Sequence, residues 1–252
     1  YYRRIKRRNM IQEILKINDN KKIAANVYEM TLVGNMSAIT SPGQFVNIKI
    51  DGLYLRRPIS VCDYTQNSLT LVYKVVGVGT AILSKKKQDD KLDVLMGLGN
   101  GYTVDARQKN PLLIGAGVGT PPLYNLAKSL IRIGANVTTL LGFHSKDDVF
   151  FEDEFKRLGC KTIIYTSDGS YGRKGRVTQA IDELCYDYVF ACGPESMLKS
   201  VDEIITSDAQ YSFEERMGCG FGACMCCSCK TKYGDKRICL DGPVLKREEV
   251  IW

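Results

Sequence analysis

The chain has 252 residues, 44% of them hydrophobic, and a formal net charge of +7. This composition indicates a globular, core-forming protein with room for two ordinary domains and a small appendage. No run approaches the roughly 18 apolar residues of a transmembrane helix, so no membrane span is expected.

The first eight residues, YYRRIKRR, hold five lysines and arginines. We interpret residues 1–9 as a basic, solvated extension, with Met10 as a candidate start of the protein proper. Binding to nucleic acid or to an anionic surface is the less favoured interpretation, and no nucleic-acid partner is expected. No apolar signal-peptide region follows, and the ten cysteines suit a reducing compartment, so a cytoplasmic protein is expected.

Residues 10–106 are predicted to form an all-β domain. Apolar side chains alternate along 28–32, 46–50 and 69–75, with turn signals such as Ser41-Pro42-Gly43 between the runs. Short strands at this spacing are typical of a barrel or a sandwich. One short helix is predicted over 80–87.

Two stretches of this domain suit a dinucleotide. In Arg57-Pro58-Ile59-Ser60, the arginine fork suits a pyrophosphate and the serine hydroxyl a flavin ring. On spacing alone, however, an exposed arginine pair before a strand is the favoured interpretation. In Gly77-Val78-Gly79-Thr80, glycines precede a helix N-terminus, where anions bind, with Thr80 as cap and phosphate donor. An ordinary capped turn is the alternative there.

Residues 107–210 are predicted to form a parallel α/β domain. Strands are expected over 111–114, 137–141, 161–166 and 188–191, and helices over 121–133, 152–158, 178–184 and 195–205. This alternation predicts a parallel sheet whose ligands bind at the carboxyl ends of the strands.

Two segments lie at that predicted edge. The first contains Gly115, Gly117, Gly119 and Thr120 and can receive a dinucleotide pyrophosphate, although the strict G-x-G-x-x-G fingerprint is absent. The second, Cys192-Gly193-Pro194, ends the fourth strand, and a buried strand cysteine followed by a turn is the favoured interpretation of it. The single histidine, His144, is expected to be an exposed loop residue, which leaves no Ser–His–Asp or Cys–His arrangement.

Residues 211–252 contain six cysteines. Four of them follow the plant-type iron–sulfur spacing C-x4-C-x2-C with a distant fourth cysteine: Cys219, Cys224, Cys227 and Cys239. Zinc is the main alternative, but the two C-x2-C pairs overlap, whereas closed zinc sites usually take two separate pairs. A disulfide cluster suits a small secreted domain better than this chain. Cys226 and Cys229 remain as free thiols near the predicted cluster.

The order of these motifs resembles that of the ferredoxin–NADP reductase superfamily, and within it the electron-transfer subunits of class 1B dihydroorotate dehydrogenases. Arg-Pro-Ile-Ser, Gly-Val-Gly-Thr, Gly-Ala-Gly-Val-Gly-Thr-Pro-Pro, Ala-Cys-Gly-Pro and the cysteine loop follow one another along the chain. The resemblance implies an FAD-binding β-barrel (10–106), an NAD-binding α/β domain (107–210) and a [2Fe–2S] module (211–252).

The resemblance also implies a role for individual residues. FAD would contact Arg57, Pro58, Ile59, Ser60, Val72, Tyr73, Lys74, Gly79 and Thr80. NAD would lie against Gly115, Gly117, Gly119, Thr120, Cys192, Gly193 and Pro194. The four cysteines named above would bind the cluster, with the spacing favouring Cys227 over Cys226.

The implied function is a redox relay without acid–base catalytic residues. Electrons would pass from the FMN of a dihydroorotate dehydrogenase catalytic subunit through the cluster and FAD to NAD⁺, in pyrimidine biosynthesis, within a heterotetramer of two copies of each subunit. The alternatives are a related subunit of a ferredoxin:NADP⁺ oxidoreductase, sulfide dehydrogenase or sulfite reductase, and a zinc-stabilised interaction module without enzymatic function.

Overall fold

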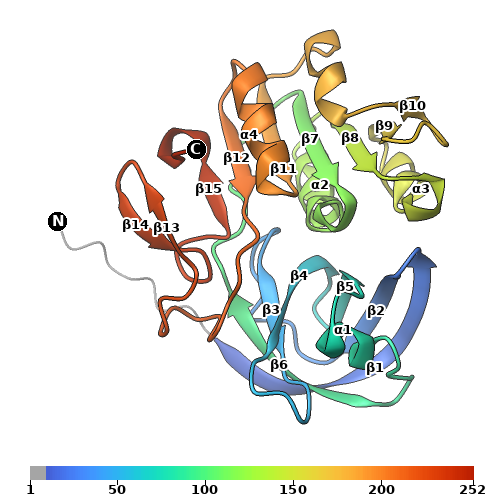
Figure 1. Ribbon diagram of the computed structural model, residues 1–252, viewed down its shortest axis with the longest axis vertical. Helices are drawn as coiled ribbons and strands as arrows, with labels where there is room; N and C mark the ends of the chain where they lie inside the picture. The colour runs from blue at the N-terminus through green and yellow to red at the C-terminus, as the bar shows by residue number, and fades with distance from the viewer. Residues whose placement is uncertain (1–9) are drawn as a thin grey trace.

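The computed structural model describes residues 10–252, so the predicted basic extension lies outside the described part of the chain. A β-barrel occupies one half of the molecule and an α/β sheet the other (Figure 1). The C-terminal segment, in red, lies beside both. Between residues 10 and 252, no helix is long and apolar enough to cross a membrane.

The predicted barrel is confirmed as a closed, six-stranded barrel in the order β1-β2-β5-β4-β3-β6. Its inward-facing aliphatic side chains, such as Leu15, Met30 and Leu71, are fully buried. Each stabilises the fold by about 1.5–3 kcal/mol relative to an exposed position. The strands are β1 (Ile11–Ala24), β2 (Val27–Val33), β3 (Phe45–Ile48), β4 (Arg57–Tyr64), β5 (Ser68–Lys74) and β6 (Lys91–Leu98).

The short helix of this domain, α1 (Val78–Leu83), starts and ends earlier than the predicted 80–87. Gly77 is its extended N-cap, and Ser84 ends it. Three lysines follow, Lys85 to Lys87, and the backbone there continues as a turn rather than a helix. The glycine pair therefore lies at the start of the helix rather than before it.

The predicted α/β domain is a seven-stranded sheet in the order β10-β9-β8-β7-β11-β12-β15. All neighbouring pairs are parallel except β12 and β15, which are antiparallel. The strands are β7 (Pro111–Ala116), β8 (Thr138–Phe143), β9 (Lys161–Thr166), β10 (Arg173–Lys174), β11 (Tyr188–Cys192), β12 (Ala209–Ser212) and β15 (Val244–Lys246).

Three of the four predicted helices of this domain are α-helices: α2 (Pro122–Arg132), α3 (Glu152–Arg157) and α4 (Glu195–Ile204). The helix predicted over 178–184 is instead a 3-10 helix, Val177–Glu183. Its backbone makes tighter bonds of the type Gln179 N–H to Arg176 O, 3.1 Å. Val177, Thr178 and Ile181 are β-branched and lower the α-helical propensity of this segment.

The C-terminal segment is joined to both domains. The hairpin β13 (Ser228–Thr231) and β14 (Gly234–Arg237) precedes β15, which is an edge strand of the large sheet. Residue 210, the predicted domain limit, lies inside β12. Cys227, Ile238 and Cys239 share one buried apolar cluster with Phe45 of the barrel and Leu245 of the sheet. The cysteine segment is therefore packed between the two domains rather than attached at the end of one.

Direct contacts fix the barrel against the sheet. Lys128 on α2 pairs with Asp63 on β4 at 2.6 Å, and the Tyr102 hydroxyl donates to the Ala191 carbonyl of β11 at 3.3 Å. On the opposite side, the Ala25 N–H at the β1–β2 turn donates to the Asp147 carbonyl at 2.9 Å. These contacts hold the barrel next to the carboxyl ends of the sheet strands.

Candidate redox site

A cavity of about 620 Å³ lies between the barrel and the carboxyl edge of the sheet. Residues following β7, β8, β9 and β11 line one side of it, and Val27 and Lys74 of the barrel line the other. Three of the residues predicted from the sequence are on its wall: Lys74, Gly117 and Pro194. Its position is the one at which open parallel sheets bind ligands.

Other residues of the glycine-rich loop support the cavity from behind. A Cβ atom on Gly119 would lie 2.2 Å from the Cys192 carbonyl oxygen, so this loop packs directly on β11. Thr120 is fully buried, and its Oγ1 has no hydrogen-bond partner. Gly115 packs against Thr120 and Leu123. These residues shape the loop, while Ala116, Gly117 and Val118 form its exposed surface toward the cavity.

Two further cavity residues were not predicted as site residues. His144, expected to be exposed in a loop, is exposed and also lines the cavity, with Nδ1 3.1 Å from the Ser167 hydroxyl. Glu214, two residues beyond β12, also lines the cavity. Although its side chain reaches solvent, the surrounding protein displaces enough water to raise the pKa of its carboxyl. His144 and Glu214 each come shortly after a strand of the sheet, and this position in the sequence is the signal by which they could have been predicted as site residues.

Cys192 is deeply buried at the end of β11. Burial, together with the charge of Glu214, raises the pKa of its thiol to about 12. The thiol is therefore neutral near pH 7 and is not an activated nucleophile. Gly193 follows it, and Pro194 then reaches the cavity wall.

The predicted flavin segment surrounds the start of α1. Arg57 opens β4, and its guanidinium lies directly over Gly79, where a Cβ atom would be 2.3 Å from Nε. Arg57 also donates to the Leu55 carbonyl. The Arg57 guanidinium and the bare backbone of Gly79 thus lie together, and we call this pair the Arg57–Gly79 cradle. A cationic fork beside an open backbone suits a pyrophosphate.

Thr80 and Tyr73 hold this segment through internal contacts. The Thr80 hydroxyl accepts from the N–H groups of Val76 (3.0 Å) and Gly77 (3.2 Å) and donates to the Gly77 carbonyl at 3.1 Å, so its one proton stays within the turn. The Tyr73 hydroxyl donates to Asn20 Oδ1 at 3.0 Å, and its ring stacks on Tyr28. The Tyr73 hydroxyl and ring are therefore both engaged within the barrel.

The cysteine loop arranges the four predicted thiols as two pairs. The Cys219 N–H lies 3.3 Å from Cys224 Sγ, and the Cys224 N–H lies 3.4 Å from Cys219 Sγ. The Cys239 N–H lies 3.4 Å from Cys227 Sγ. Each iron of a [2Fe–2S] rhomb takes two protein thiolates, so two thiol pairs fit this cluster. No three His, Cys, Asp or Glu side chains within residues 10–252 are grouped around a single metal position.

Backbone donors favour the thiolate form at Cys219. Its Sγ accepts from the N–H groups of Phe221 (3.4 Å), Ala223 (3.2 Å) and Cys224. Partial burial alone raises the pKa of Cys219, but these donors outweigh it and lower the pKa to about 6. Cys227 is buried and paired with Cys239, whereas Cys226 is exposed, so the geometry favours Cys227 as the ligand.

Comparison with known proteins identifies two parts of the chain. Residues 214–251 match the iron–sulfur cluster binding domain of dihydroorotate dehydrogenase B, and residues 113–203 match the oxidoreductase NAD-binding domain. The chain is 44% identical over 256 residues to the dihydroorotate dehydrogenase B (NAD(+)) electron transfer subunit of Geobacillus sp. (strain WCH70), covering 96% of this chain and 99% of that protein. The subunit from Fusobacterium nucleatum is 43% identical over 250 residues, covering 93% and 96%.

The chain belongs to the dihydroorotate dehydrogenase B electron transfer subunits.

Membership of this family confirms the predicted NAD-linked oxidoreductase subunit and its iron–sulfur and NAD cofactors. As an electron transfer subunit it works with a catalytic partner. The match of 214–251 to a cluster-binding domain argues against the zinc-stabilised module.

Solved structures confirm the ferredoxin reductase-like fold. An NADH-dependent reduced ferredoxin-NADP oxidoreductase has a TM-score of 0.86 and 34% identity, covering 94% of this chain and 90% of that one. A ferredoxin NADP⁺ reductase from Neisseria gonorrhoeae has a TM-score of 0.67 and 17% identity, covering 76% and 89%. This fold supports FAD as the third cofactor.

Proposed function

We propose that this chain transfers electrons between an FMN-containing dihydroorotate dehydrogenase catalytic subunit and NAD⁺, in pyrimidine biosynthesis. The observation that supports the proposal is the packing of the paired cysteines between the barrel and the sheet. The interdomain cavity lies between the same two domains. Such packing keeps three redox groups close together without acid–base residues.

FAD is assigned to the barrel, with Arg57, Pro58, Ile59 and Ser60 along β4 and with Gly79 and Thr80 at α1. The Arg57–Gly79 cradle supports this assignment. Val72 and Tyr73 would contribute mainly backbone, because their side chains are buried, whereas the Lys74 side chain is exposed and lines the cavity. When bound, a flavin supplies the exchange between the hydride chemistry of nicotinamide and the one-electron chemistry of a cluster. The protein contributes orientation and exclusion of water.

NAD is assigned to the 620 Å³ cavity. Gly117 and Pro194 line this cavity, and Lys74 of the proposed flavin segment faces it from the barrel. The loop and strand behind the cavity wall are held by Gly115, Gly119, Thr120, Cys192 and Gly193. The cluster is assigned to Cys219 with Cys224 and to Cys227 with Cys239. The two hydrogen-bonded thiol pairs support this division.

We further propose a heterotetramer with two copies of each subunit, acting in the cytoplasm. The ten free cysteines between residues 10 and 252 suit a reducing compartment. We keep the proposed division of the chain into residues 1–9, 10–106, 107–210 and 211–252. The α/β domain and the C-terminal module are joined where β12 pairs with β15.

The second candidate function is that of a related subunit of a ferredoxin:NADP⁺ oxidoreductase. The structural similarity to an NADH-dependent reduced ferredoxin-NADP oxidoreductase, at a TM-score of 0.86, favours it as the alternative. The identity of 34% to that protein is lower than the 44% to the dihydroorotate dehydrogenase relative, so the first candidate is preferred.

Isolation of the native complex tests the proposal. We expect co-purification with an FMN protein, and dihydroorotate oxidation coupled to NAD⁺ reduction. A complex that reduces NAD⁺ only from reduced ferredoxin would overturn the assignment in favour of the second candidate. Arg57→Ala should lower the FAD content of the purified chain, and an unchanged flavin content would contradict the assignment of Arg57.

A further inference from the structure

Asn47 on β3 connects the barrel to the cysteine loop. Its neighbours Val46 and Ile48 belong to the barrel core, whereas Phe45 packs in the cluster that contains Cys227 and Cys239. Asn47 itself is 1% exposed, and its Nδ2 donates to the Cys219 carbonyl at 3.1 Å. A barrel residue thus holds the backbone of the first proposed cluster ligand, 172 positions away in the sequence.

The loop closes tightly on this amide. Gly220, directly after Cys219, has a positive φ of 80°. A Cβ atom on Gly220 would lie 2.4 Å from Asn47 Nδ2, which is far inside van der Waals contact. Only glycine allows both this backbone conformation and this approach. The contact is therefore constrained from both sides.

Only one end of the Asn47 side-chain amide makes a hydrogen bond. Asn47 Oδ1 is buried and has no hydrogen-bond partner. A buried acceptor without a donor destabilises the fold, and an apolar side chain of similar size would avoid that penalty. The N–H donated to Cys219 is what an apolar residue could not supply.

Asn47 also adjoins the proposed flavin segment. It is opposite Pro58 in the β3–β4 register, and its carbonyl accepts from Arg56 Nη1 at 3.2 Å. Arg56 in turn pairs with Asp93 at 2.9 Å. One residue therefore contacts the cysteine loop through its side chain and the flavin strand through its backbone.

We propose that Asn47 is a positioning residue for the cluster. By holding the Cys219 carbonyl, it orients the turn whose N–H groups, from Phe221 and Ala223, point at Cys219 Sγ. Hydrogen bonds to the ligand sulfurs tune the potential of an iron–sulfur cluster. Asn47 thus sets the placement of the Cys219–Cys224 half of the site and, through the N–H groups that point at Cys219 Sγ, the reduction potential of the cluster. This inference rests on the proposed cluster ligands.

The test uses the full chain purified with its cofactors, as wild type, Asn47→Leu and Asn47→Asp. Asn136→Leu is the matched control, because the Asn136 side chain makes a single 3.4 Å hydrogen bond on the surface. Iron and FAD content, the electron paramagnetic resonance spectrum of the reduced protein and a redox titration are measured. We expect both Asn47 variants to retain FAD and to show altered g-values. We also expect a roughly tenfold change in the equilibrium constant for cluster reduction, about 59 mV for one electron.

Gly220→Ala provides a second approach if the Asn47 variants do not fold, because it displaces the same contact from the loop side. It should also alter the spectrum and the potential. The inference would be overturned if Asn47→Leu had the spectrum and potential of the wild type. If only Gly220→Ala folds, the same result in that variant would overturn it. Absence of iron from the wild-type protein would instead refute the proposed cluster site, so the two failures are distinguishable.

Discussion

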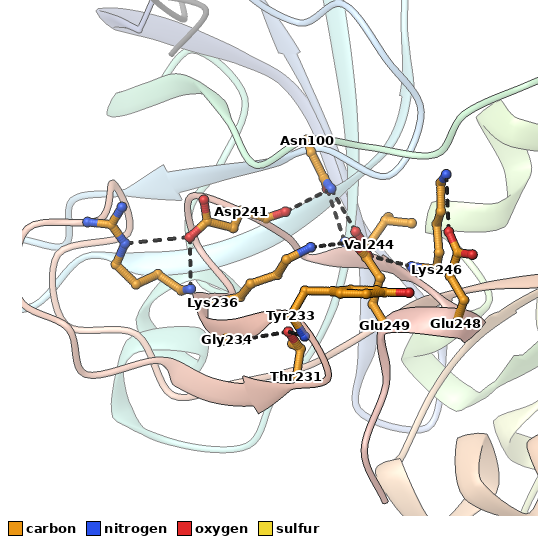
Figure 2. A network of polar contacts seen from close by, with 11 residues as sticks. Asn100, Thr231, Tyr233, Gly234, Lys236, Asp241, Val244, Lys246, Glu248 and Glu249 are labelled. Atoms are coloured by element: carbon orange, nitrogen blue, oxygen red, sulfur yellow. Dashed lines mark hydrogen bonds and ion pairs between the residues drawn. The ribbon is translucent and has the colours of Figure 1, made fainter. Parts of the chain in front are cut away.

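The Asn100 side chain bonds both backbone polar groups of Val244. Asn100 Nδ2 donates to the Val244 carbonyl at 2.6 Å, and the Val244 N–H donates to Asn100 Oδ1 at 3.1 Å (Figure 2). The same Nδ2 donates to the Asp241 carbonyl at 3.0 Å. A residue just beyond β6 thus fixes the chain that leaves Cys239 and enters β15.

Asn100→Leu should therefore loosen the segment that follows Cys239. The loss of three side-chain hydrogen bonds at a partly buried site predicts a destabilisation of about 2–3 kcal/mol. For a chain of this size, the melting temperature should fall by roughly 4–12 °C. Iron content should fall relative to FAD content. Melting by circular dichroism and iron analysis measure both, with Asn136→Leu as control; an unchanged iron-to-FAD ratio would contradict the role.

The pairing of the thiols predicts a contrast between adjacent cysteines. Cys227→Ser should remove the cluster absorbance, because Cys227 is buried beside Cys239. Cys226→Ser should retain it, because Cys226 is exposed. Visible absorbance per FAD is the measurement. The reverse outcome would assign the ligand to Cys226.

The packing of the glycine-rich loop on β11 predicts that Gly119→Ala impairs NAD binding. The added methyl group would meet the Cys192 carbonyl oxygen at 2.2 Å, and neither backbone can yield without moving the loop. We expect the Kd for NAD to rise at least about tenfold, or 1.4 kcal/mol, with FAD retained. Asn136→Leu is again the control, because the Asn136 side chain makes a single 3.4 Å hydrogen bond on the surface. Equal affinities in both variants would exclude the packing role.

The Lys236–Glu249 ion pair predicts an acid-sensitive contribution to stability. The pair is drawn in Figure 2, and Lys236 Nζ lies 2.5 Å from Glu249 Oε1. Both side chains are 17% exposed. Burial alone raises the pKa of Glu249, but Lys236 and the Lys246 N–H outweigh it, so the pKa is lowered. A lowered folded-state pKa stabilises the protein above the ordinary glutamate pKa, and that stabilisation is lost as the pH falls through the lowered value.

Glu249→Gln should therefore lower the free energy of unfolding at pH 7 by about 1–2 kcal/mol, with a smaller difference from wild type near pH 3. Melting temperatures across this pH range measure the effect. Glu248→Gln is the matched control, because Glu248 is 64% exposed and lies 3.5 Å from Lys246. A pH-independent difference for Glu249→Gln would show that the pair contributes by shape rather than charge.

Local patterns were sufficient to predict an all-β domain and a parallel sheet, while the choice of a barrel over a sandwich came from the family resemblance. Alternating side chains reveal a strand because its two faces meet different environments, and this holds for β2 and β5. Likewise, the C-x4-C-x2-C spacing lies within one loop, so the sequence alone indicates that its thiols converge. The ligation itself remains a prediction.

Tertiary structure decided what distant segments do together. It placed His144 and Glu214 on the cavity wall, and it placed Thr120 behind that wall rather than on it. It also brought Asn47 to Cys219 and Asn100 to Val244, contacts across 172 and 144 positions of the chain. An asparagine on or after a strand carries no local pattern that identifies its partner, because the partner is set by how whole domains pack. The cysteine spacing by itself therefore indicated an iron–sulfur site over a zinc site, because three of its ligands lie within one loop. The packing of the barrel against the C-terminal segment determined how that loop is held.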